Sequence, residues 1–237
     1  HLQLHLVNEA LRNSSAHEIV NVFPYMRFSR QDKKDESRTS QSAKALQDII
    51  QPYANRILTV DVHNPAIQGF YDVPFDNLYS APLVVSFLQT HHRPMLEDLV
   101  VMSPDAGGAS RAQAFAKKLD QDSVAIGYKV RPKEGEVASI RILGDVSGKN
   151  VLMIDDIIDS GNTLIKAALA VREQGARAVY AYCTHALFTE GIEKVAAAFD
   201  RLFISDTLQT PPHPKVEVIS LVPLFADAIH RTNEGLS

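Results

Sequence analysis

Residues 151–163 constrain the fold more than any other part of the chain. Residues 151–154 are apolar and predict a buried strand, and two acids, Asp155 and Asp156, follow where that strand would end. Small polar residues then lead into a helical pattern that starts at Leu164. Such a turn lets several backbone N–H groups converge at the positive end of a helix dipole. It therefore predicts an anion site that needs no Lys or Arg.

The two acids add a second kind of chemistry to this turn. At the carboxyl edge of a sheet, Asp155 and Asp156 can accept hydrogen bonds from vicinal hydroxyls or face a magnesium ion. Phosphate, diol and metal together indicate a sugar phosphate. A simpler interpretation is that the acids merely end the strand and that Asp159 or Ser160 caps the helix. We favour a ligand site because all these features fall within thirteen residues.

Strand and helix patterns alternate through the rest of the chain, which predicts an α/β fold with mostly parallel sheets flanked by helices. A strand that runs into a cluster of polar residues occurs twice, before Asp61 and His63 and again before Asp155. We therefore expect two similar α/β domains, residues 1–80 and 81–237, with a closing helix over 221–231. The predicted strands are 19–23, 56–61, 98–102, 123–127, 137–143, 151–154, 178–183, 202–204 and 216–220.

Composition excludes several classes of function. The formal charge of −4 shows no basic excess for nucleic-acid binding. The single cysteine, Cys183, excludes an internal disulfide framework and fits a reducing compartment. No apolar run approaches the roughly twenty residues of a membrane span, so we expect a cytoplasmic protein without nucleic-acid or membrane partners. Because His1 already stands inside a helical pattern, we also expect an upstream segment to be missing.

The stretch from 151 to 163 resembles the phosphoribosyl-pyrophosphate (PRPP) signature, which phosphoribosyltransferases share with ribose-phosphate diphosphokinases (PRPP synthetases). The resemblance implies two phosphoribosyltransferase-type domains. It also implies that Asp155 and Asp156 bind the ribose hydroxyls and that the following loop wraps the 5-phosphate. The loop residues are Asp159, Ser160, Gly161, Asn162 and Thr163. The family loop often reads Asp-Thr-Gly-Gly-Thr, so Ser160 and Asn162 depart from it.

Three further segments resemble PRPP synthetases. The polar loop that starts near Arg30 matches an Arg-Gln-Asp motif, which implies ATP contacts for Arg30 and Gln31, although its composition alone indicates a solvated loop. His63 follows a strand and matches a residue associated with the magnesium of the metal nucleotide. Asp105 lies in a Pro-Asp-Ala-Gly-Gly turn that matches a second metal-associated position. The resemblance thus implies Mg²⁺ as cofactor, with His63 and Asp105 near it.

Lys129 and Arg131 stand where the family begins its catalytic flexible loop, Lys-Arg-Arg-Pro. The resemblance implies that these two cations stabilise the transition state, and Val130 replaces the middle Arg. Without the resemblance, residues 128–136 indicate only a solvated hairpin tip before the next strand.

The resemblance implies transfer of the diphosphoryl group of ATP to the anomeric hydroxyl of ribose 5-phosphate, giving PRPP and AMP. It also implies a homo-oligomer, with dimers building a hexamer and ADP and phosphate as regulators. Two alternatives stay open. One is a catalytically impaired, synthetase-associated regulatory subunit or fragment, and the other is a phosphoribosyltransferase.

Overall fold

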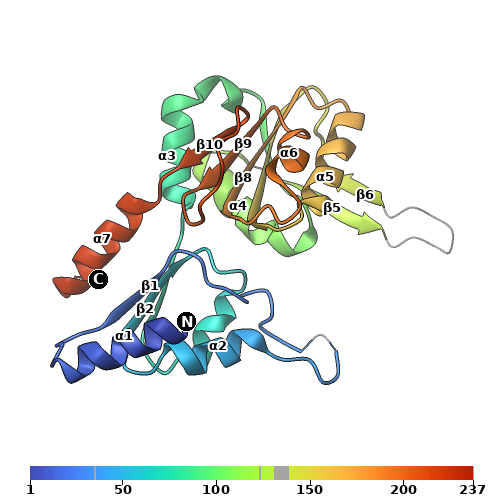
Figure 1. The fold of residues 1–237 in the computed structure, drawn as a ribbon. Coiled ribbons are helices and arrows are strands. Elements are labelled where there is room, and N and C mark those ends of the chain that lie inside the picture. Colours follow the sequence, from blue (N-terminus) through green and yellow to red (C-terminus); the bar gives the residue numbers. More distant parts are fainter. Residues whose placement is uncertain (35, 123, 131–138, 237) are drawn as a thin grey trace. The chain divides into compact units, whose positions relative to one another are not determined.

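The computed structural model describes residues 1–34, 36–122, 124–130 and 139–236. The chain divides into two compact units, His1–Tyr79 and Ser80–Ser237. Each is described by itself, and Figure 1 shows their elements in sequence colours.

The first unit is built on a parallel sheet of three strands, β1 (Val20–Phe23), β2 (Arg56–Val60) and β3 (Phe75–Leu78), in the order β1-β2-β3. Its helices are α1 (Leu2–Asn13), α2 (Ser42–Ile50) and the 3₁₀ helix η1 (Pro65–Phe70). Leu46 and Ile50 of α2 pack with Ile57 of β2 in one apolar cluster. The strand β3 was not predicted, because its sequence Phe-Asp-Asn-Leu has no apolar run.

The second unit holds a sheet of seven strands in the order β10-β9-β8-β7-β4-β5-β6, parallel except for the antiparallel edge strand β6. The strands are β4 (Leu99–Ser103), β5 (Val124–Val130), β6 (Ser139–Leu143), β7 (Asn150–Ile158), β8 (Ala178–Ala186), β9 (Arg201–Ser205) and β10 (Val216–Ile219). The helices are α3 (Ala81–His91), η2 (Arg93–Leu96), η3 (Ala106–Gly108), α4 (Ala109–Lys118), α5 (Asn162–Glu173), α6 (Ile192–Ala196) and α7 (Val222–Asn233).

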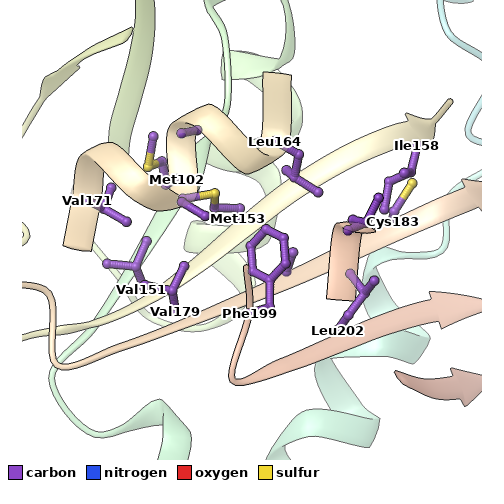
Figure 2. Close-up of a cluster of buried hydrophobic side chains, with 14 of the residues drawn as sticks. Met102, Val151, Met153, Ile158, Leu164, Val171, Val179, Cys183, Phe199 and Leu202 are labelled. Atoms are coloured by element: carbon purple, nitrogen blue, oxygen red, sulfur yellow. The ribbon is translucent and has the colours of Figure 1, made fainter. Parts of the chain in front are cut away.

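The strand β7 lies in the middle of this sheet, between β4 and β8. Helices cover both faces, so β7 reads as a continuous apolar run rather than as an alternating one. On one face Val151 and Met153 pack with Leu164 and Val171 of α5 (Figure 2). On the other face, Leu152 and Ile154 pack with residues of α3 and α4, namely Val84, Leu88, Ala112 and Phe115.

Burial on both faces fixes where β7 ends and therefore where its acids lie. A fully buried Val, Leu, Ile or Met side chain contributes about 1.5–3 kcal/mol, so a shift of register would cost several such terms. Since β4 and β7 are parallel neighbours, their carboxyl ends, and with them Asp105 and Asp155, lie at the same edge of the sheet.

One expectation needs correction. Lys129 was expected on a loop that starts near Tyr128, but β5 continues to Val130, and Lys129 pairs with Ile140 of β6. The helix α1 turns apolar side chains to solvent: Leu2, Leu6 and Leu11 are exposed, whereas Asn8 is buried.

Across the described residues, none of the helices combines the length and the apolar content that crossing a bilayer requires.

Candidate functional site

The turn between β7 and α5 has a backbone that only glycine fits. Gly161 is the N-cap of α5 and has a φ of +75°, in the left-handed region. A Cβ added there would lie 2.5 Å from Cγ2 of the buried Val195 of α6. The carbonyl of Gly161 accepts from the N–H of Ile165 at 2.9 Å, so the first N–H groups of α5 have no partner within the helix and face the turn. This arrangement is compatible with the anion site that the sequence predicts.

The polar side chains of the turn are oriented by the segment that follows β8. Thr189 donates from its hydroxyl to Oδ1 of Asp159 at 2.7 Å. The Lys194 ammonium donates to Oδ1 of Asn162 at 2.8 Å, and Nδ2 of Asn162 donates to Oγ of Ser160 at 3.1 Å. Lys194, which also forms an ion pair with Glu190, therefore places its ammonium next to the start of α5. Sequence analysis missed it because no local pattern distinguishes it from an ordinary surface lysine.

The two acids of β7 lie in different surroundings. Asp156 is buried, and its Oδ1 lies 3.0 Å from Nη1 of Arg111 on α4. Asp155 is half-buried, and its Oδ1 accepts from the N–H of Asp156 at 2.9 Å. Loss of solvent raises the pKa of Asp155 well above its usual range, the neighbouring Asp156 raises it further, and Arg111 opposes both. Ligand hydroxyls that donate to Asp155 would favour its ionised form.

Arg111 is a site residue that sequence analysis did not identify. It lies on the first turn of α4, three residues after Gly108 at the end of the glycine turn. The available signal was a cation on the helix that follows Asp105, which is a weak indication without knowledge that α4 packs beside β7. In the structure it neutralises a buried carboxylate, which would otherwise be costly to hold.

The turn between β4 and α4 brings Asp105 and Lys129 together. Oδ1 of Asp105 accepts from the N–H groups of Gly107 and Gly108 at 3.0 and 3.3 Å, which fixes its side chain. Its Oδ2 faces Nζ of Lys129 on β5 at 3.4 Å. Gly127 lets β5 approach so closely, because a Cβ there would lie 2.4 Å from the carbonyl oxygen of Pro104. Both partners of the ion pair are substantially exposed and can exchange it for contacts with a ligand.

The remaining predicted residues of the nucleotide site lie in the first unit. Arg30 and Gln31 are exposed on the loop after β1, and His63 is exposed on the turn after β2. Because β1 and β2 are parallel neighbours, these segments leave the same edge of the sheet. Arg131, the second predicted catalytic cation, lies outside the described residues.

The carboxylate of Asp105 is a ligand of the kind that Mg²⁺ prefers. Mg²⁺ is usually held by one or two carboxylates together with water and substrate phosphates rather than by a cage of protein ligands. Within the described ranges, no group of three or more His, Cys, Asp or Glu side chains converges as such a cage. Of the two predicted metal-associated residues, His63 belongs to the first unit and Asp105 to the second.

A mostly parallel sheet with an acidic pair and an anion-binding turn at one edge defines a sugar-phosphate-binding α/β domain. Comparison with known families agrees: residues 79–204 match the phosphoribosyl transferase domain, and residues 1–53 match the N-terminal domain of ribose phosphate pyrophosphokinase.

Curated relatives extend the match to almost the whole chain. The ribose-phosphate pyrophosphokinase of Hyphomonas neptunium is 41% identical over 239 residues, which cover 97% of this chain and 75% of the relative. That of Synechococcus elongatus is 38% identical and covers 100% of this chain and 72% of the relative. The chain belongs to the ribose-phosphate pyrophosphokinase family.

A solved structure shows the same fold. The crystal structure of phosphoribosylpyrophosphate synthetase from Mycobacterium smegmatis superposes with a TM-score of 0.89 at 32% identity, covering 98% of this chain and 76% of that one. The predicted fold class, α/β with two phosphoribosyltransferase-type domains, is confirmed, and so is the resemblance on which it was based.

Proposed function

We propose that this chain transfers the diphosphoryl group of ATP to the anomeric hydroxyl of ribose 5-phosphate, forming PRPP and AMP. The observation that carries the proposal is the match to ribose-phosphate pyrophosphokinases along 97–100% of the chain, through both units. A match confined to residues 79–204 would have fitted a phosphoribosyltransferase equally well.

The turn after β7 supports the role of a ribose 5-phosphate site. The N–H groups at the start of α5, with the side chains of residues 159–163, would bind the 5-phosphate, and Asp155 and Asp156 would accept from the ribose hydroxyls. Hydroxyls that donate to a carboxylate favour its ionised form, so substrate binding is expected to lower the raised pKa of Asp155. Sugar binding and ionisation of Asp155 therefore assist each other.

The ion pair of Lys129 and Asp105 supports a role in charge stabilisation. Diphosphoryl transfer requires mainly positioning and neutralisation of the charge on the transferring group. Lys129 would turn from Asp105 to the phosphate oxygens, and Arg131 would add a second cation. Magnesium, when bound, would neutralise phosphate oxygens, and we assign Asp105 and His63 to its surroundings. Arg30 and Gln31 would contact ATP from the loop after β1.

Assembly, regulation and location are also part of this proposal. We expect a homo-oligomer, dimers building a hexamer, with ADP and phosphate as regulators and a cytoplasmic location. The exposed apolar side chains of α1, Leu2, Leu6 and Leu11, support an assembly surface, because such a cluster at the surface is commonly covered by a partner.

The test is an assay of AMP release from ATP that depends on both ribose 5-phosphate and Mg²⁺. Lys129→Ala should lower turnover by about 100- to 1000-fold, as removal of one preorganised charge-stabilising group typically does, and should leave ribose 5-phosphate binding nearly intact. Lys118→Ala, on the exposed side of α4, is the matched control and should keep normal turnover. Near-normal turnover of Lys129→Ala would remove this residue from the catalytic role.

The same preparations separate the two alternatives. A regulatory subunit would bind ribose 5-phosphate but release no AMP by itself. A phosphoribosyltransferase would instead form a nucleotide from PRPP and a free base.

A further inference from the structure

Asn64 connects the two loops of the first unit that carry the expected nucleotide-binding residues. Its Oδ1 accepts from the N–H of Ala66 at 3.0 Å and so caps η1. Its Nδ2 donates to Oδ2 of Asp32, on the loop after β1. The N–H of Ala66 is a donor and the Asp32 carboxylate is an acceptor, so a single orientation of the amide satisfies both. The cap thus aims the Asn64 donor at Asp32.

The main chain beside Asp32 is held by α2. Nε2 of Gln41 donates to the carbonyl oxygen of Asp32 at 2.6 Å, and the N–H of Ala43 donates to that of Gln31 at 3.2 Å. The main chain of this loop is therefore tied to the start of α2, whereas the carboxylate of Asp32 is tied to the turn that follows β2. The side chains of Arg30 and Gln31 remain exposed above this fixed backbone.

We infer that Asn64 is a positioning residue for the nucleotide site, holding the loop of Arg30 and Gln31 in a defined place relative to His63. The inference rests on the proposed function, because ATP is the ligand that these residues would share. The described part of residues 24–41 contains no helix or strand. A segment of this kind loses conformational freedom when it closes on a ligand, and ordering it beforehand reduces that cost at the moment of binding.

The substitution Asn64→Asp separates positioning from capping. Aspartate caps a helix about as well as asparagine, so the contact with Ala66 is kept. The contact with Asp32 is lost, because two carboxylates then face each other. The double variant Asn64→Asp with Asp32→Asn exchanges donor and acceptor and should restore the link. Asn233→Asp, on the exposed end of α7 in the second unit, makes the same charge change outside the unit that carries both loops.

We expect Asn64→Asp to raise the KM for ATP about tenfold, which corresponds to about 1.4 kcal/mol. The KM for ribose 5-phosphate and the kcat at saturating ATP should stay unchanged. The double variant should return the KM for ATP to within about twofold of the original value, and Asn233→Asp should leave it unaltered. A purely structural role predicts no such selectivity between the two substrates.

Hydrogen exchange of residues 29–34, measured without ligand, gives a readout that does not need activity. Exchange should be faster in Asn64→Asp and normal again in the double variant. If the original chain releases no AMP while this exchange pattern holds, the proposed function fails, whereas the ordering of the loop of Arg30 and Gln31 by Asn64 stands. If the chain is active and Asn64→Asp shows unchanged exchange and an unchanged KM for ATP, the positioning role is overturned.

Discussion

The two sheets each carry candidate functional side chains at the edge formed by the carboxyl ends of their strands. These two edges hold their side chains by different means. The edge that we propose for ribose 5-phosphate, called the sugar-phosphate edge, is formed by Asp155, Asp156 and residues 159–163 of the second unit. It is built into the core: Asp156 is 3% exposed, and Gly161 has no room for a Cβ. The edge that we propose for nucleotide binding, called the nucleotide edge, is formed by Arg30, Gln31 and His63 of the first unit. It is exposed and is held by hydrogen bonds between loops.

Because of this difference, substitutions at the two edges should affect different quantities: the free energy of unfolding at one edge and ligand binding at the other. A group in the core cannot be changed without altering packing or leaving a buried charge alone. A group on an exposed loop can be removed with little effect on stability, so its contribution appears in ligand binding. Substitutions at the sugar-phosphate edge should therefore change stability and function together, and those at the nucleotide edge should change function alone.

The largest effect on the free energy of unfolding is expected from Arg111→Met, which removes the guanidinium that pairs with the buried carboxylate of Asp156. Loss of one partner of a buried ion pair typically costs about 3–5 kcal/mol in free energy of unfolding. The measurement is the urea midpoint at an unchanged m-value. Arg231→Met breaks an exposed pair with Asp227 on α7 and should cost no more than about 0.5 kcal/mol. Equal losses in the two variants would contradict the distinction between a buried and an exposed pair.

Gly161→Ala should lower the free energy of unfolding by about 2–4 kcal/mol, because alanine disfavours the left-handed backbone and its methyl group would contact Val195. Gly148→Ala is a matched control, since Gly148 has a φ of +69° but no atom within 4 Å of an added Cβ. The difference between the two unfolding free energies isolates the steric part. If the two alanines cost the same, α6 yields to the added methyl group, and the turn is less rigid than its packing indicates.

Much of the sugar-phosphate edge could be predicted because its signals are local. The apolar run of β7, the acids at its end and the small residues of the turn are consecutive in the chain. Arg111 was not predicted, since its contact with Asp156 joins residues 45 positions apart. The continuation of β5 through Lys129 was missed for a similar reason: these residues are exposed, and only their pairing with β6 makes them a strand.

The nucleotide edge was predicted from resemblance rather than from local physics. A polar run such as the one around Arg30 has the composition of any solvated loop, and nothing in it indicates the hydrogen bond between Asp32 and Asn64. The roles of these residues remain predictions that binding experiments must test.

Asp155→Asn should raise the free energy of unfolding at neutral pH, by less than Arg111→Met and Gly161→Ala should lower it. The pKa of Asp155 is raised in the folded state, mainly by burial, so the folded protein binds this proton more tightly than the unfolded chain. Stability should fall as pH rises from the unfolded pKa, about 3.9, to the raised value. The variant lacks this slope and should be more stable than the original chain at neutral pH, while binding of ribose 5-phosphate is lost.

Asp145→Asn is the control for the direction in which the free energy of unfolding changes with pH. A hydrogen bond from Lys149 lowers the pKa of Asp145, so the original chain gains stability above the unfolded pKa and loses it as pH falls through the folded value. Unfolding free energies measured from pH 3 to pH 8 should therefore change in opposite directions for the two variants. A loss of stability at neutral pH in Asp155→Asn would show that hydrogen bonds outweigh the burial of this carboxyl.

The smallest effect on stability is expected from His63→Ala. This variant tests the expectation that substitutions at the nucleotide edge change function alone. The side chain is exposed at the end of β2, so its removal should change the free energy of unfolding by no more than about 0.5 kcal/mol. The Mg²⁺ concentration needed for half-maximal AMP release should rise, while binding of ribose 5-phosphate stays normal. A urea midpoint lowered as far as that of Arg111→Met would mean that the nucleotide edge is also part of the folding core. The separation of stability from binding would then hold for neither unit.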